Sequence, residues 1–373
     1  MNSYAEASEQ QSQISAPAQA VRAIAGVIMD EYRRSRLFYA AFALFVAVTV
    51  TATFVIGDDL LPVIGAYTKR LPTILVGITA AALASLGILA VKSRNQGPVM
   101  PAMIRRLSKM NEDGMLIRLP LAMLTFSLFM GCYLYWKMKI TWVAPFSWDE
   151  TFARLDAWLL GGRQGWEVLM PMLGHPKITT IIDSAYSMWA LLCAAVWLLV
   201  AGLKRVPLHL RNHYWLATLL TWLVGLGLGT ALSSAGPIYY HHITGDHELY
   251  AGLRDYLLML EAEFLVAPLL QDLLWNVHVG KVDGIGGISA MPSMQNAQAL
   301  LFVLLAWHLG YVFRIWTIWF AATILLGSVH LGWHYLVDGL LAFAMVPPLW
   351  WIAGKLTGSS LARTSAHQRA LEA

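Results

Sequence analysis

Long apolar runs recur along this chain, and they restrict its fold more than any other feature of the sequence. Eight runs lie at about 37–56, 72–91, 119–138, 178–203, 214–233, 294–312, 315–333 and 335–354. Each is long enough to cross the hydrocarbon core of a bilayer as a helix. A soluble fold of this length could not bury a composition that is 58% hydrophobic and 13% charged. The sequence therefore predicts an all-α polytopic membrane protein with about eight transmembrane helices.

The distribution of basic residues predicts how these helices are oriented. If the N-terminus is inside, 17 of the 26 Lys and Arg residues fall in inner segments, as expected for loops on the cytoplasmic side. This favours an N-in, C-in topology in a bacterial-type inner (plasma) membrane. The formal charge of +4 reflects the same bias. The sequence lacks a basic groove with interleaved aromatic residues, so no nucleic-acid partner is predicted. Nothing in the sequence predicts the oligomeric state.

Four regions follow from this pattern. We expect residues 1–36 to be a disordered cytoplasmic tail, because the first 20 residues are polar and lack the apolar core of a signal peptide. Residues 37–113 would form a two-helix hairpin and a basic cytoplasmic loop. Residues 114–356 would form a six-span core, and 357–373 a second cytoplasmic tail. Cys132 and Cys193 fall inside predicted spans and are interpreted as packing residues.

Ionisable residues interrupt the last apolar stretch, SVHLGWHYLVDGLL. His330, His334 and Asp338 are spaced four residues apart, so on one helix they would share a face. Such groups are costly at membrane depth, which makes this stripe a candidate functional site. One alternative is a cation held by the two imidazoles and the carboxylate, which would require further ligands. For His330 alone, hydrogen bonding between packed spans is an equally good interpretation.

A glycine-rich loop, GIGGISAMPSMQNAQALLF, precedes the sixth predicted span. Gly284, Gly286 and Gly287 permit unusual backbone angles, and Ser293 after Pro292 is well placed to cap a helix. A loop that leads into a helix N-terminus suits a phosphate. The alternative is a flexible loop that only starts a span.

The segment PFSWDETFARLDAWLLGG predicts an amphipathic helix lying in the membrane interface. Its apolar face would carry Trp148, Phe152, Leu155 and Leu159, and its polar face Asp149, Glu150, Arg154 and Asp156. The alternative is an ordinary amphipathic connector. A second long outer segment runs from about 234 to 293.

Two of these features together resemble a known family. The Pro-Ser pair ending at Ser293, followed about forty residues later by His334-x-x-x-Asp338, is similar to the second and third signature motifs of the type 2 phosphatidic acid phosphatase superfamily. Within it, the chain most resembles the inositol phosphorylceramide synthase-like branch, which also has SAGP followed by tyrosines, here Ser234–Tyr240, and an earlier Leu-Asp pair, here Leu155 and Asp156. The resemblance covers roughly residues 119–355.

The resemblance implies a metal-independent, cofactor-free lipid phosphatase or phosphotransferase. The predicted topology would place its site at the outer membrane face. His334 would be the nucleophile that forms a phosphohistidine, and Asp338 would orient its ring. This division of labour is also chemically sound, since a neutral imidazole nitrogen can attack phosphorus while a carboxylate fixes the other nitrogen. Ser293 and nearby amides would hold the phosphoryl oxygens, with His330 as an auxiliary contact. The implied substrate is a membrane lipid, either a phospholipid or a sphingolipid.

One position departs from the family pattern at the expected acid. The second motif normally ends in His, but the matching residue here is Gln295, whose amide cannot serve as a general acid at neutral pH. Three explanations stay open: an artificial substitution, a naturally inactive protein, or another proton donor. The candidate donors are His241, His242, His247 and His278.

The basic residues that hold phosphate in the family are also not recognisable. The Lys-to-Arg-Pro first motif is absent, and Ser328 stands where the third motif has Arg. Substitute contacts are Arg254, Lys281, Tyr239 and Tyr240, each of which could equally be a solvated or interfacial side chain. These departures leave a second hypothesis open, a non-catalytic lipid-binding or transport protein that retains the fold.

Overall fold

The computed structural model describes residues 21–22, 24–68, 114–203, 205–260 and 265–359, and its regular elements within these ranges are all helical. Five helices are long and apolar enough to cross a membrane: α2 (Arg36–Ile56), α6 (Met115–Val143), α11 (Leu208–Ala231), α16 (Tyr311–His330) and α17 (Leu336–Leu356). The predicted all-α polytopic class is confirmed. The predicted span at 72–91 lies outside the described residues.

A further span is interrupted by a bend. Helices α9 (Pro176–Ser187) and α10 (Trp189–Gly202) meet at Met188 with an angle of 41° between them, and together they are apolar enough to count as one broken span. The sequence predicted a continuous helix over 178–203. The apolar run continues through the bend, so hydropathy alone does not reveal it.

The helix that begins at Ser293 is shorter than predicted. Helix α15 (Met294–Ala306) has 13 residues, whereas the predicted span ran to residue 312. At about 1.5 Å per residue it is about 20 Å long, less than the roughly 30 Å of a hydrocarbon core. The chain turns at Gly310, whose φ of 120° is a conformation that favours glycine, and α16 begins at the next residue.

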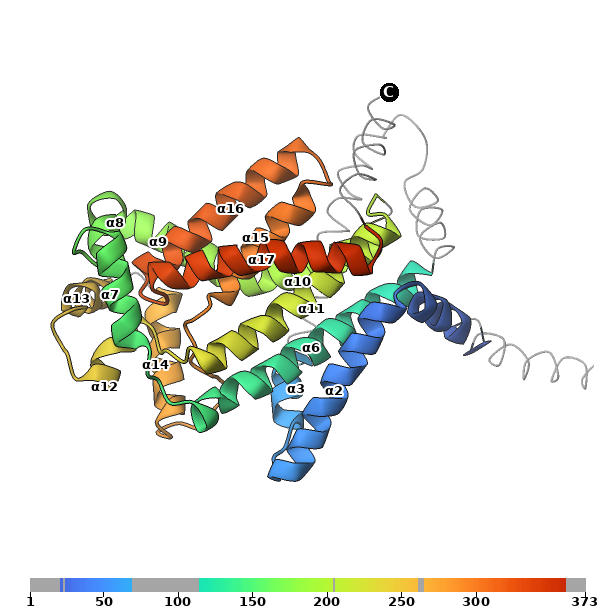
Figure 1. The fold of residues 1–373 in the computed structure, drawn as a ribbon, viewed down its shortest axis with the longest axis horizontal. Coiled ribbons are helices and arrows are strands. Elements are labelled where there is room, and N and C mark those ends of the chain that lie inside the picture. The colour runs from blue at the N-terminus through green and yellow to red at the C-terminus, as the bar shows by residue number, and fades with distance from the viewer. Residues whose placement is uncertain (1–20, 23, 69–113, 204, 261–264, 360–373) are drawn as a thin grey trace, which may run out of the picture.

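Long helices lie side by side and form the core (Figure 1). Helix α11 packs against α6 and α17, and α15 packs against α16 and α17. Large buried aromatic residues fill the space between α6, α10 and α11, and the rings of Trp197 and Trp215 lie 5.1 Å apart. Cys132 and Cys193 are buried free thiols in this core, as the sequence predicted.

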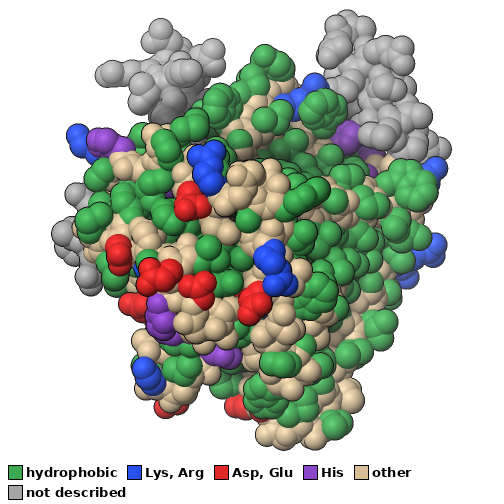
Figure 2. Space-filling view, turned by 60° about the vertical axis from the view of Figure 1, so that its left-hand side comes forward, with side chains coloured by type: hydrophobic (Ala, Val, Ile, Leu, Met, Phe, Trp, Pro, Cys, Tyr) green, Lys and Arg blue, Asp and Glu red, His purple; other side chains and the backbone are tan. Residues whose placement is uncertain are grey.

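Short elements gather at one end of the bundle, which we call the loop end (Figure 1). They are α7 (Asp149–Leu159), α8 (Gly165–Leu173), η1 (Pro237–Tyr239), α12 (Tyr240–Thr244), α13 (Ala251–Met259) and α14 (Val266–His278). Figure 2 turns this end forward and shows acidic and histidine side chains there, beside a largely hydrophobic flank. The Asp183 carboxylate fixes α14 by accepting hydrogen bonds from the amides of Val266 and Ala267 at its first turn.

Part of the predicted N-terminal tail is ordered. Residues 24–34 are helical, and the buried Glu31 pairs with Arg211 of α11 at 2.7 Å. The prediction of disorder up to residue 36 is therefore wrong for this stretch. A buried ion pair to a distant helix was not visible in the local composition. The described part of the predicted hairpin continues from α2 into α3 (Leu61–Thr68), which packs on α6.

Candidate active site

The predicted one-helix stripe of His330, His334 and Asp338 does not exist, because the chain turns inside it. Helix α16 ends at His330, Gly332 adopts a φ of 75°, and α17 begins only at Leu336. The turn sends His330 elsewhere: its Nε2 lies 2.9 Å from the hydroxyl of Thr179. The cation alternative places these three side chains on one helix face, which this turn prevents, and the described residues contain no group of three ligating side chains suited to a metal ion.

His334 and Asp338 do meet as predicted, across the start of α17. His334 Nδ1 lies 3.2 Å from Asp338 Oδ2, and the amide of Tyr335 donates to the same oxygen at 3.0 Å. Asp338 is the third residue of α17, so its carboxylate also caps the helix. Both side chains are buried. With its Nδ1–H donated to the carboxylate, the imidazole has a lone pair on Nε2.

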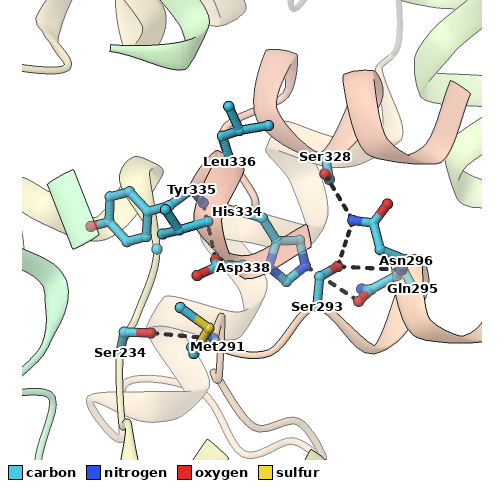
Figure 3. A network of polar contacts seen from close by, with 12 residues as sticks. Ser234, Met291, Ser293, Gln295, Asn296, Ser328, His334, Tyr335, Leu336 and Asp338 are labelled. Carbon is cyan, nitrogen blue, oxygen red and sulfur yellow. Dashed lines mark hydrogen bonds and ion pairs between the residues drawn. The ribbon is translucent and has the colours of Figure 1, made fainter. Parts of the chain in front are cut away.

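That Nε2 faces the second motif. It lies 3.3 Å from Oε1 of the Gln295 side-chain amide, on the first turn of α15, so residues 39 positions apart come together (Figure 3). An acceptor nitrogen needs a donor, and an amide that turns its NH₂ toward the ring supplies one. The side chain that faces Nε2 is therefore an amide, which cannot deliver a proton at neutral pH.

Two further carboxylates hold the same helix start. Asp156 accepts hydrogen bonds from the amides of Leu336 and Val337 at 2.7 and 3.0 Å. Asp149 accepts one from the hydroxyl of Tyr335 at 2.8 Å, and others from two amides of the loop before η1. We call Asp149, Asp156 and Asp338 the carboxylate clasp.

The clasp corrects the predicted amphipathic pattern of α7. Asp149 and Asp156, expected on a polar outer face, are buried, whereas Leu155 and Leu159, expected on the apolar face, are exposed. The reason is that the unpaired backbone amides at the start of α17 attract these carboxylates. The spacing of apolar residues in the sequence does not reveal this interaction. Tyr335 is likewise buried, and its hydroxyl donates a hydrogen bond to Asp149.

The clasp and the nucleophile have shifted pKa values. Burial raises the pKa of Asp156 to about 6, although its two amide partners oppose the shift, and burial also raises the pKa of Asp149. For His334, burial and then the positive charge of Lys137 lower the pKa to about 3. The imidazole is therefore neutral at pH 7, which is the nucleophilic form.

A cavity of about 240 Å³ opens beside the imidazole. Its polar lining includes His334, Gln295, Tyr239 and Lys137, and Lys137 is the one Lys or Arg among its described lining residues. Sequence reasoning missed Lys137 because it lies inside the predicted span 119–138. A lysine within an apolar run was the available signal.

The glycine-rich loop closes against Lys137 through close packing. A Cβ on Gly287 would lie 2.9 Å from the carbonyl oxygen of Lys137, and on Gly284 or Gly286 it would collide with Val277 or Leu274 of α14. None of the three glycines has a positive φ. The prediction of unusual backbone angles is therefore wrong. These positions need glycine because the loop packs too closely on its neighbours to admit a Cβ.

Ser293 caps α15 as predicted, but its side chain does not line the cavity. Its Oγ accepts hydrogen bonds from the backbone amide and the side-chain amide of Asn296, at 3.4 and 2.9 Å. The same Asn296 side chain reaches Ser328 at 3.2 Å (Figure 3). Ser293 and Ser328 thus belong to a network that ties α15 to α16.

The other predicted contacts are spread over the loop end. Tyr239 lines the cavity while its hydroxyl donates to the carbonyl of Gln271 at 3.0 Å. Tyr240 packs on Tyr250, and the Arg254 guanidinium donates to the carbonyl of His247. The residues absent from the cavity lining are Tyr240, Arg254, Lys281, His330, His241, His242, His247 and His278.

A family model described as the PAP2 superfamily matches residues 150–352, more than half of the chain. The chain belongs to the PAP2 superfamily. The match runs from α7 to α17 and includes Gln295, His334 and Asp338. Comparisons with curated proteins and with solved structures gave no match. Members of the PAP2 superfamily are phosphatases or phosphotransferases that share this membrane fold.

Proposed function

We propose that this PAP2 superfamily member transfers phosphoryl groups from a membrane lipid through a phosphohistidine at His334. The observation that supports this most directly is the imidazole itself: Asp338 holds Nδ1, and Nε2 borders a cavity that also contains Lys137. We place the reaction at the outer, periplasmic face of a bacterial-type inner membrane, on the basis of the charge distribution of the sequence.

The proposed chemistry has two steps. The Nε2 lone pair attacks phosphorus, and the bond to the leaving lipid oxygen breaks with its electron pair while that oxygen takes up a proton. Asp338 stabilises the positive charge that develops on the ring. A water or alcohol hydroxyl then attacks phosphorus and loses its proton, and the N–P bond breaks so that the electron pair returns to Nε2.

We assign the proton for the leaving oxygen to the ammonium of Lys137. Gln295 cannot supply it, and the four histidines considered from the sequence are not among the residues that line the cavity. Lys137 lines the cavity with Gln295 and His334, and the structure records no ion pair for it among the described residues. Its charge would also stabilise the phosphoryl oxygens in the transition state.

The charge of the cavity favours a phosphodiester over a phosphomonoester. One lysine complements the single negative charge of a phosphodiester, whereas a monoester dianion or a diphosphate calls for more positive charge. This agrees with the resemblance to the inositol phosphorylceramide synthase-like branch. The proposed reaction is therefore transfer of a phosphate-linked headgroup to a hydroxyl, such as that of a ceramide-like lipid, with water as the competing acceptor.

The test uses purified protein with a panel of phospholipids and prenyl diphosphates. We expect acid-labile phosphate on His334, which His334→Ala abolishes, and faster turnover in Gln295→His. Lys137→Arg should keep KM close to wild type while kcat falls about 10²-fold to 10⁴-fold, because the charge stays but proton donation is lost. Lys137→Met should impair both constants, and the exposed Lys281→Met is the matched control. No labelling, release or exchange by either wild type or Gln295→His would overturn the proposal.

Gln295 itself favours one other candidate, a non-catalytic lipid-binding or transport protein. This candidate predicts tight lipid binding without turnover, unaffected by His334→Ala. Binding and turnover measured on the same preparations separate the two functions.

A further inference from the structure

Three hydrogen-bond donors in the wall of the active-site cavity have no partner among the residues that the structure describes. They are the Tyr186 hydroxyl and the indole N–H groups of Trp189 and Trp333, all buried, and all belonging to side chains that line the cavity. Tyr186 is only 7% exposed. Unpaired buried donors are costly, so three around one cavity indicate that a ligand supplies the acceptors. We call these residues the donor wall.

The donor wall lies at the bend between α9 and α10, next to the nucleophile. Tyr186 and Trp189 flank Met188, where the helix direction changes by 41°. Trp333 immediately precedes His334, and its ring stacks on Tyr186 with centroids 6.5 Å apart and planes 10° apart. Positions 186, 189 and 190 have the i, i+3, i+4 spacing of one helix face, and together with 187 they line the cavity.

The chemistry of the donor wall points to neutral oxygen atoms. An indole N–H can only donate, so the ligand must accept. The lining residues Ala190, Ala267 and Leu270 are apolar, and the one described Lys or Arg of the lining, Lys137, is close enough to His334 for its charge to act on that ring. An anionic phosphoryl group is better held by Lys137. What fits the donor wall is an acceptor attached to hydrocarbon, which describes the carbonyl of a fatty-acyl ester or amide.

We propose that Tyr186, Trp189 and Trp333 bind the carbonyl oxygens of the acyl linkages in the lipid whose phosphate faces His334. This inference rests on the proposed function and adds the lipid class to it. Acylated glycerolipids and sphingolipids carry such carbonyls, whereas prenyl phosphates have no oxygen outside their phosphate groups. The cavity of about 240 Å³ holds a phosphate and a linkage region, and the hydrocarbon chains stay in the bilayer.

The test compares diacyl with dialkyl phosphatidylglycerol of equal chain length, because an ether linkage keeps the shape but lacks the carbonyl. A prenyl phosphate forms a third arm. Affinity is measured by native mass spectrometry in detergent, for wild type and for His334→Ala. The variants Tyr186→Phe, Trp189→Phe and Trp333→Phe each remove a donor; the first keeps the phenyl ring, and the other two replace the indole with a smaller aromatic ring. Trp319→Phe, at a position that is 69% exposed on α16, is the matched control.

Wild type should bind the diacyl lipid about tenfold more tightly than the dialkyl lipid, the equivalent of one or two hydrogen bonds. Each Phe variant should lose part of this preference through weaker diacyl binding, with dialkyl affinity unchanged, and Trp319→Phe should retain it. Equal affinities in wild type, or Phe variants that weaken both lipids alike, would overturn the subsite. If the diacyl preference persists while neither wild type nor Gln295→His turns over any lipid, the subsite stands and the phosphotransferase proposal fails.

Discussion

At the scale of single residues, the pKa values of His334 and Asp156 are shifted in opposite directions within one site. The folded-state pKa of Asp156, about 6, lies above its ordinary value of 3.8, so the native state binds more protons and stability falls as pH rises from about 4 to 6. The pKa of His334, about 3, lies below 6.5, so the unfolded state binds more protons and stability rises with pH across the same window. The two contributions oppose each other.

Replacing either side chain should reveal how the other makes stability depend on pH. We expect the melting temperature of Asp156→Asn to rise more steeply between pH 4 and 6.5 than that of wild type, and that of His334→Ala to rise less steeply or fall. Thermal unfolding in detergent at several pH values checks this. Glu150→Gln, an exposed position on the same helix, should keep the wild-type slope. Identical slopes in all four proteins would contradict the assigned shifts.

At the scale of elements, the sequence predicted where most helices lie but not where they break. Apolar runs located α2, α6, α11, α16 and α17 because a span needs little more than length and hydropathy. The turn at Gly310 and the bend at Met188 lie inside continuous apolar runs, so hydropathy did not reveal them. The turn around Gly332 was missed because a four-residue spacing of polar groups reads as one helix.

The contact between Gly287 and α6 gives a second prediction. Gly287→Ala would place a Cβ 2.9 Å from the Lys137 carbonyl oxygen, and a backbone atom cannot give way as a flexible side chain can. The loop must move, which should cost about 1–3 kcal/mol of stability and lower turnover by displacing Lys137 relative to His334. Gly227→Ala in α11, which meets open space, should be neutral or gain up to about 1 kcal/mol. Matching melting temperatures and rates for the two variants would argue against this account.

At the scale of the whole molecule, the site lies at the loop end of the bundle, and the charge pattern predicts that this end faces outward. A membrane-impermeant maleimide should label Lys281→Cys from outside intact cells and Arg205→Cys only after permeabilisation. Both positions are exposed, and the native Cys132 and Cys193 are buried and should stay unlabelled. The reverse pattern would place the site on the cytoplasmic side.

The parts of the candidate site that belong to the two sequence motifs were predictable. The parts that depend on contacts between distant segments were not. The pairing of His334 with Asp338 and the approach of Gln295 followed from short spacings and a resemblance. Lys137 comes from a helix some 160 residues before Gln295, and no local pattern links them. The acids of α7 were recognised as charged but not as partners of amides near residue 336.

The carboxylate clasp has a consequence for how such a chain can vary. Its hydrogen-bond donors at positions 235, 336 and 337 are backbone amides, which every residue except proline provides. Those positions can therefore drift through many side chains without loosening the start of α17. The aspartates themselves cannot be exchanged freely, since a glutamate is one methylene too long for the same pocket and an asparagine offers only one acceptor oxygen. In a set of related sequences, the architecture around the nucleophile would be recognised by these acids and their side-chain donors His334 and Tyr335, set among otherwise variable neighbours.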